Sequence, residues 1–190
     1  MTEFEFIFAL YALVLGLSLV EILAGLGRTL EMRFASEASG ESFSIGWLTP
    51  LLAVFVILDL LSFWMFSWSV RTVVAVSPAT LLAVVAFASA YYLAARLVFP
   101  SDPERFRDLD THYFRVCRTV MAMLIALVAV QWAYLASLPQ VREALFSPLS
   151  VGLTVVFVAM MATLAIVRNR HVHAIVLVAL SVRYLVLYLA

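Results

Sequence analysis

Three ionisable side chains, Glu21, Asp59 and Arg183, lie within stretches of sequence that are otherwise apolar. The stretches are long enough to cross a lipid bilayer, and a charge at the centre of a bilayer costs roughly 2.5–3.5 kcal/mol on insertion scales. Each charge is therefore expected to have a partner or to face a water-filled cavity, or to be retained because the function of the protein requires it. Ionisable residues in membrane helices commonly mark ion and proton pathways. These three residues are the first candidates for a functional site.

Other residue types exclude several kinds of chemistry. All twelve basic residues are arginine, so a retinal or pyridoxal Schiff base and a lysine nucleophile are excluded. The single cysteine, Cys117, excludes an internal disulfide and a zinc site built from several thiolates. His112, His171 and His173 are weak metal candidates, because helical metal sites use spacings of three or four residues. We expect interfacial histidines in contact with water, and neither a metal nor a cofactor.

The composition is that of a membrane protein. Apolar residues make up 65% of the 190-residue chain and charged residues 13%, whereas soluble domains have about 25% charged residues. Glu3 and Glu5 stand where a cleavable signal peptide has positive charge, so we expect the first helix to be retained. We predict an all-α polytopic membrane bundle with one transmembrane domain over residues 1–190. Its six helices are expected over 6–26, 45–70, 73–98, 116–137, 149–167 and 172–189.

The arginines predict the orientation. If the amino terminus lies outside the cytoplasm, nine arginines fall in or near inner connections, whereas only Arg71 and Arg142 fall on the outer side. Arginine in short loops favours the cytoplasm, so both termini are expected to be non-cytoplasmic. Aromatic residues at helix ends favour the headgroup level. We expect Trp64, Trp68, Trp132, Tyr134, Tyr184 and Tyr188 at the outer interface, and Trp47, Tyr91 and Tyr92 at the inner one.

Depth along the helices predicts one ion pair. At 1.5 Å per residue, Asp59 lies about 20 Å and Arg183 about 17 Å from the cytoplasmic ends of their helices. Opposite charges at one depth on separate helices can compensate each other in hydrocarbon. We therefore predict a direct pair between Asp59 and Arg183.

Glu21 belongs to a different environment, about 8 Å from the inner face. Long arginine side chains at that level can reach water while their stems stay in the bilayer. We predict a cytoplasmic-side salt-bridge network of Glu21 with Arg28, Arg96 and Arg118, and a proton or cation site is the alternative.

Two inner connections carry most of the remaining charge. Residues 101–112 and the acidic segment Glu31–Ser44 are expected to be solvated loops or short surface helices. The alternative is a surface that docks a partner, with Arg105 and Arg107 as contact residues.

Several short segments resemble a family of small, uncharacterised six-helix bacterial inner-membrane proteins. They are 11–21, 46–50, Asp59 with Phe63 and Trp64, 92–95, 99–100 and 112–115. The resemblance covers roughly the first two thirds of the chain. It implies a multi-pass protein of the bacterial inner membrane and carries no activity.

Two functions fit these observations. The first is permeation or transport of a small ion or solute, with Glu21 and Asp59 facing a polar path and Arg183 tuning Asp59. The alternative is a membrane scaffold or accessory subunit that docks a partner through its cytoplasmic loops. A serine with a nearby base, a phosphate-binding glycine loop and a multi-ligand metal motif are absent from the sequence, so an enzyme is not expected. The expected partners are the lipid bilayer and a second copy or another membrane protein, and no nucleic acid.

Overall fold

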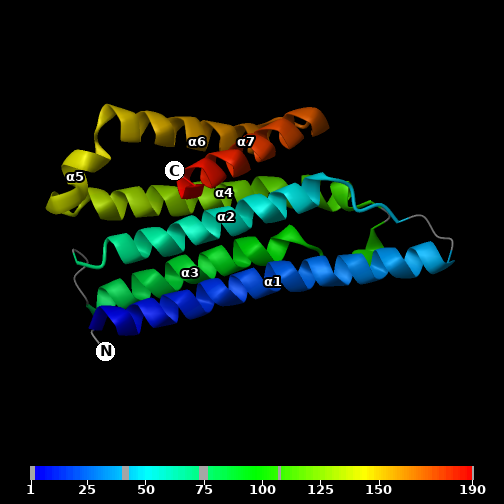
Figure 1. Cartoon of the computed structure of the whole chain (residues 1–190), viewed down its shortest axis with the longest axis horizontal. Coiled ribbons are helices and arrows are strands. Elements are labelled where there is room, and N and C mark those ends of the chain that lie inside the picture. The colour runs from blue at the N-terminus through cyan, green and yellow to red at the C-terminus, as the bar shows by residue number, and fades with distance from the viewer. Residues whose placement is uncertain (1–2, 40–42, 73–76, 107, 190) are drawn as a thin grey trace.

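The chain folds into a bundle of α-helices in the computed structural model, which describes residues 3–39, 43–72, 77–106 and 108–189. Most of the helices run along the long axis of the molecule (Figure 1). The elements are α1 (Glu3–Ser39), α2 (Leu48–Ser69), α3 (Pro78–Val98), the 3₁₀ helix η1 (Pro103–Arg105), α4 (Leu109–Ala136), α5 (Pro139–Leu145), α6 (Pro148–Ile166) and α7 (Arg170–Leu189).

Six of the described helices are long and apolar enough to cross a membrane. Each of them overlaps one of the six predicted segments, which confirms the all-α fold class. The additional helix, α5, has only seven residues and connects α4 to α6. It begins at Pro139, and proline is favoured in a first helical turn because its missing N–H has no partner there.

The first helix is much longer than predicted. It continues past the expected end at residue 26 as far as Ser39, so most of the predicted loop Glu31–Ser44 is helical. Residues 40–42 of that segment lie outside the described residues. In the extension, the Nε of Arg33 lies 3.0 Å from Oε1 of Glu37, and pairs four residues apart stabilise an exposed helix. Figure 1 shows this end of α1 projecting beyond the other helices.

The fourth helix begins seven residues earlier than predicted, at Leu109. Asp108 caps it, because its Oδ1 accepts a hydrogen bond of 3.0 Å from the amide of Asp110. The Leu109 amide donates to the carbonyl of Ser44 over 3.1 Å, which ties this end of α4 to the connection before α2. The predicted loop at 101–112 is therefore η1 followed by a capped helix.

Serine caps followed by proline define two other helix starts. Ser77 precedes Pro78 and its Oγ accepts from the Thr80 amide over 3.1 Å. Ser147 precedes Pro148 and accepts from the Ser150 amide over 3.3 Å. The side chain replaces a hydrogen bond that the first turn lacks.

The main packing pairs are α1 with α3, α3 with α4, α4 with α6, and α2 with α7. One cluster of buried side chains runs through the bundle, with the largest contributions from Phe55, Tyr91, Met121, Met161 and other residues that are fully covered. The three predicted charged positions lie on α1, α2 and α7, so their environments depend on how these helices rotate about their axes.

Candidate functional site

Asp59 lies in the buried centre of the bundle, with only 2% of its surface exposed. Two tyrosines from other helices donate hydrogen bonds to its carboxylate. The Tyr184 hydroxyl of α7 lies 2.5 Å from Oδ1, and the Tyr91 hydroxyl of α3 lies 3.1 Å from Oδ2. Hydrogen bonds from hydroxyl donors compensate the cost of burying a carboxylate. The three residues join α2, α3 and α7 at one point.

Tyr91 has two acceptors within reach. Its hydroxyl lies 2.7 Å from the Val56 carbonyl oxygen as well as 3.1 Å from Oδ2 of Asp59. A hydroxyl carries one proton, so Tyr91 alone cannot make both hydrogen bonds at full strength. A group at position 59 that donates to Tyr91 would let Tyr91 donate to Val56.

Arg183 does not pair directly with Asp59, contrary to the prediction. Its guanidinium lies over the rings of Phe157, at 4.5 Å, and Tyr184, at 5.1 Å. Consecutive residues of an α-helix point about 100° apart, and it is Tyr184 rather than Arg183 that reaches the carboxylate. Tyr184 instead contacts both: its hydroxyl binds the carboxylate and its ring lies under the guanidinium. Arg183 therefore satisfies its charge on ring faces.

Two of the tyrosines expected at the membrane interfaces are buried within the bundle. Tyr91 is fully buried and Tyr184 is 4% exposed, so both face the core. Trp47, Trp64, Trp68 and Tyr134 are exposed on the surface of the bundle. The sequence held one signal for the partners of Asp59: a buried carboxylate requires donors, and tyrosine supplies an apolar ring with a hydroxyl.

Glu21 forms ion pairs with two of the three predicted arginines. The Nη1 of Arg96, from α3, lies in direct contact with Oε1 of Glu21, and the Nη2 of Arg28 lies 3.5 Å from the same oxygen. The second guanidinium nitrogen of Arg96 donates to the Ser101 hydroxyl over 3.2 Å. The Glu21 side chain is 19% exposed, so this is a partly covered charge cluster that links α1 to α3.

A glycine allows α1 and α3 to approach closely beside this cluster. A Cβ at Gly25 would lie 2.5 Å from Cβ of Phe99, a separation that two carbon atoms do not adopt. Small residues at helix crossings commonly allow such close approach in membrane bundles. The close approach lies one turn along α1 from Glu21.

Arg118 does not join the Glu21 cluster. It lines a separate cavity of about 190 Å³ where α6 ends, and this cavity also contains Cys117, Arg168 and His173 in its wall. The predicted network is therefore reduced to Glu21, Arg28 and Arg96.

The three histidines differ in environment. His171 is exposed, as expected, but His112 is buried and its Nε2 lies 3.1 Å from the Leu97 carbonyl. His173 is 1% exposed and uses both ring nitrogens, with Nδ1 2.6 Å from the Tyr113 hydroxyl and Nε2 2.6 Å from the Val167 carbonyl. His112 and His173 are therefore core residues rather than interfacial ones. No group of three or more metal-ligating side chains occurs in the described part of the chain.

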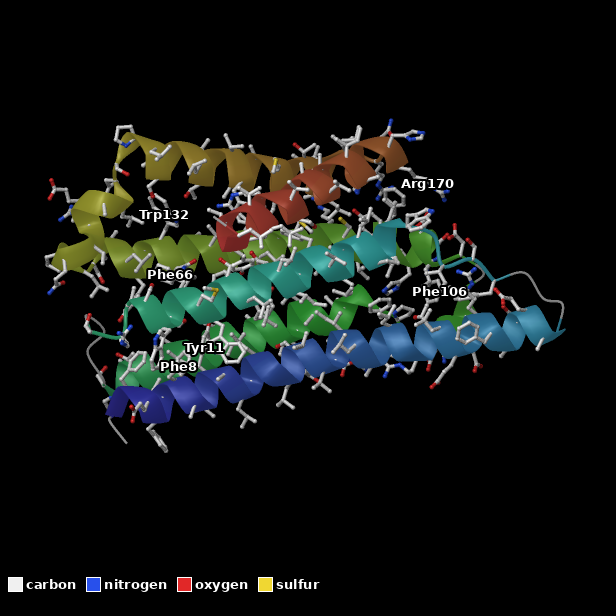
Figure 2. All side chains as sticks on the ribbon, viewed as in Figure 1. Phe8, Tyr11, Phe66, Phe106, Trp132 and Arg170 are labelled. Carbon is white, nitrogen blue, oxygen red and sulfur yellow. The ribbon has the colours of Figure 1, made fainter. Side chains whose placement is uncertain are left out.

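A larger cavity, of about 260 Å³, lies among α1, α2, α3 and α4. Its wall is mostly apolar, and its aromatic members are Phe4, Phe8, Tyr11, Phe63, Phe66, Phe87 and Tyr134. Figure 2 shows Phe8, Tyr11 and Phe66 in the half of the bundle that contains the amino terminus. A few polar groups, those of Ser67, Thr80 and Gln131, also line it. An apolar cavity with a small number of polar groups is typical of small-molecule binding sites.

The side chain of Phe63 lies between this aromatic cavity and the Asp59 site. Phe63 lines the cavity and packs edge-on against Tyr91, with ring centroids 5.7 Å apart. Tyr91 in turn donates to Asp59. Neither Asp59 nor Glu21 lines either of the two cavities.

Comparison with known protein families, characterised proteins and solved structures finds no match to this chain.

Proposed function

We propose that this protein is a multi-pass protein of the bacterial inner membrane that binds a small solute in the aromatic cavity, as the first step of permeation or transport. The composition of the six apolar helices and the asymmetry of the arginines support this location, with both termini outside the cytoplasm. The observation that carries the binding proposal is the cavity among α1–α4.

The lining of the cavity indicates the class of solute. None of its described lining residues is charged, so the cavity favours a neutral molecule over an ion. Aromatic faces and edges contact alkyl and aromatic groups, and the Gln131 amide can bind a polar atom of the solute. The proposed solute is an apolar or amphipathic molecule with one or two hydrogen-bonding groups.

A matched pair of substitutions on α3 tests this proposal. Ala83 lines the cavity, whereas its neighbour Leu82 is 71% exposed on the outer surface of the bundle. The binding of a small apolar fluorophore, N-phenyl-1-naphthylamine, is measured with purified protein in nanodiscs. Ala83→Phe fills the cavity and is expected to weaken binding by about tenfold or more, whereas Leu82→Phe leaves it unchanged. Equal binding by wild type and Ala83→Phe contradicts the proposal.

Permeation of an ion past Glu21 and Asp59 is a separate proposal with less support. Glu21 is held by two arginines and Asp59 by two tyrosines, so an ion would have to displace these partners. Ion flux through reconstituted protein that falls with Glu21→Gln or Asp59→Asn would favour this proposal. The absence of ion flux through the wild-type protein would rule out this ion-permeation proposal.

A scaffold or accessory subunit is the second candidate function. Its support is that both membrane carboxylates have partners within the chain, which makes a structural role sufficient for them. Docking would use the cytoplasmic connections, where Arg105 is exposed and pairs with Asp102 at 3.3 Å. Arg107 lies outside the described residues. A copurifying protein or second copy that is lost with Arg105→Glu would favour this function.

A further inference from the structure

The cavity beside Arg118 lies between the side of α4 and the point where α6 ends and α7 begins. Arg118 is on α4, and Arg168 is in the short connection between α6 and α7. Both line this cavity of about 190 Å³. The neighbouring wall residue Ile166 is 79% exposed, so charged and apolar surfaces adjoin at the rim.

Arg118 and Arg168 differ from most of the described arginines, because no described side chain forms an ion pair with them or places an aromatic ring under them. Among the eleven arginines that the structure describes, five form ion pairs and three lie over aromatic rings. Only Arg118, Arg142 and Arg168 have neither type of contact in the described ranges. Two of these three border the same cavity, whereas Arg142 lies on α5.

The local charge of the cavity is positive. No acidic residue is among its described lining residues. The carbonyl end of α6 contributes about half a negative charge, which is less than the two full positive charges of the guanidinium groups. His173 does not supply a competing acceptor, because both of its ring nitrogens have protein partners. The cavity therefore attracts an anion.

We propose that Arg118 and Arg168 bind a phosphate group at this cavity. Guanidinium groups match phosphate oxygens in geometry and charge, and basic pockets between membrane helices bind anionic lipid headgroups. The position at helix ends corresponds to the headgroup level of a bilayer. An anionic phospholipid and free inorganic phosphate both supply this chemistry, and the two sources can be separated by experiment.

The test measures retained lipid and bound phosphate on purified protein. Native mass spectrometry follows phosphatidylglycerol and phosphatidylcholine on the wild type, Arg118→Gln, Arg168→Gln and the control Arg142→Gln. Each of the two cavity substitutions removes a charged hydrogen bond and is expected to weaken phosphatidylglycerol binding by about tenfold. Arg142→Gln is expected to bind as the wild type does. Because the three arginines are exposed and unpaired, thermal unfolding in detergent should show similar stability for all four proteins.

Competition with inorganic phosphate identifies the source. Retention of phosphatidylglycerol that millimolar phosphate does not displace, and that requires both arginines, supports a lipid headgroup site. Phosphate binding that requires both arginines and displaces the lipid supports a site for the free anion. Binding of both phosphatidylglycerol and inorganic phosphate that is the same in Arg118→Gln, Arg168→Gln, Arg142→Gln and the wild type overturns the proposal.

Discussion

The Tyr184 hydroxyl donates a hydrogen bond to Oδ1 of Asp59 over 2.5 Å, although the two residues are 125 positions apart in the sequence. This contact joins α2 to α7 in the buried part of the bundle. The same Tyr184 lies under the guanidinium of the partly buried Arg183, so one tyrosine contacts both Asp59 and Arg183. The stability of the bundle should therefore depend on this tyrosine.

Tyr184→Phe is expected to destabilise the protein by about 1–2 kcal/mol, because Oδ1 of Asp59 loses its donor while remaining buried. The measurement is the thermal unfolding of purified protein in detergent. Tyr92→Phe is the control, since Tyr92 is a partly buried neighbour of Tyr91 with no hydroxyl contact to Asp59. An identical melting temperature for Tyr184→Phe and the wild type would contradict this expectation.

Asp59→Asn is expected to retain the fold better than Asp59→Leu. An amide at position 59 can accept from Tyr184 and donate to Tyr91, whose own proton then serves the Val56 carbonyl. Leucine leaves both tyrosine hydroxyls without this partner. Melting temperatures of the two variants give the comparison, and a less stable Asp59→Asn would show that the negative charge itself is needed.

Exchange of the two charges, Asp59→Arg with Arg183→Asp, is not expected to restore stability. Tyr184 holds Asp59, and Arg183 lies on ring faces, so an exchange places an arginine between two hydroxyl donors. Expression and melting of the exchange variant and both single variants provide the measurement. Recovery of the wild-type melting temperature by the exchange variant would support the direct ion pair between Asp59 and Arg183 that was predicted from depth.

The Glu21–Arg96 pair is expected to contribute about 1 kcal/mol to stability, more than an exposed pair does. Glu21→Gln, Arg96→Gln and the double variant form a thermodynamic cycle that isolates the pair. The corresponding cycle on Arg33 and Glu37, which are exposed, is the control. Equal coupling energies in the two cycles would count against a special role for the partly covered cluster.

Two glycines of α1 are expected to respond in opposite ways. Gly25→Ala should lower the melting temperature, because its Cβ meets Phe99 at 2.5 Å. Gly27→Ala meets no atom within 4 Å and gains helix propensity of about 1 kcal/mol, so it should be neutral or stabilising. Thermal unfolding of both variants checks the sign, and a tolerated Gly25→Ala would mean that α1 and α3 can separate without loss.

The helix ends show which helix boundaries can be predicted from local sequence. Proline and serine mark the start of α3 and α6, and apolar segments of sufficient length locate the six long helices. Hydropathy does not mark the ends of α1 and α4, because a helix can continue into water when capping and ion pairs replace apolar contacts. The predicted loop at Glu31–Ser44 was therefore largely wrong, whereas the segment 101–112 contains a short helix, η1, as one of the two expected alternatives, and then the start of α4.

By itself, the sequence determined that the chain forms six long apolar helices and that Glu21, Asp59 and Arg183 are costly in such helices. These conclusions need only composition along one segment. The tertiary structure decided which side chains satisfy the charges: Arg96 for Glu21, tyrosines for Asp59, and aromatic rings for Arg183. That choice depends on the rotation of each helix about its axis, where one residue shifts a side chain by about 100°. Packing between helices sets this rotation. The depth of a residue along a single helix gives no information about it.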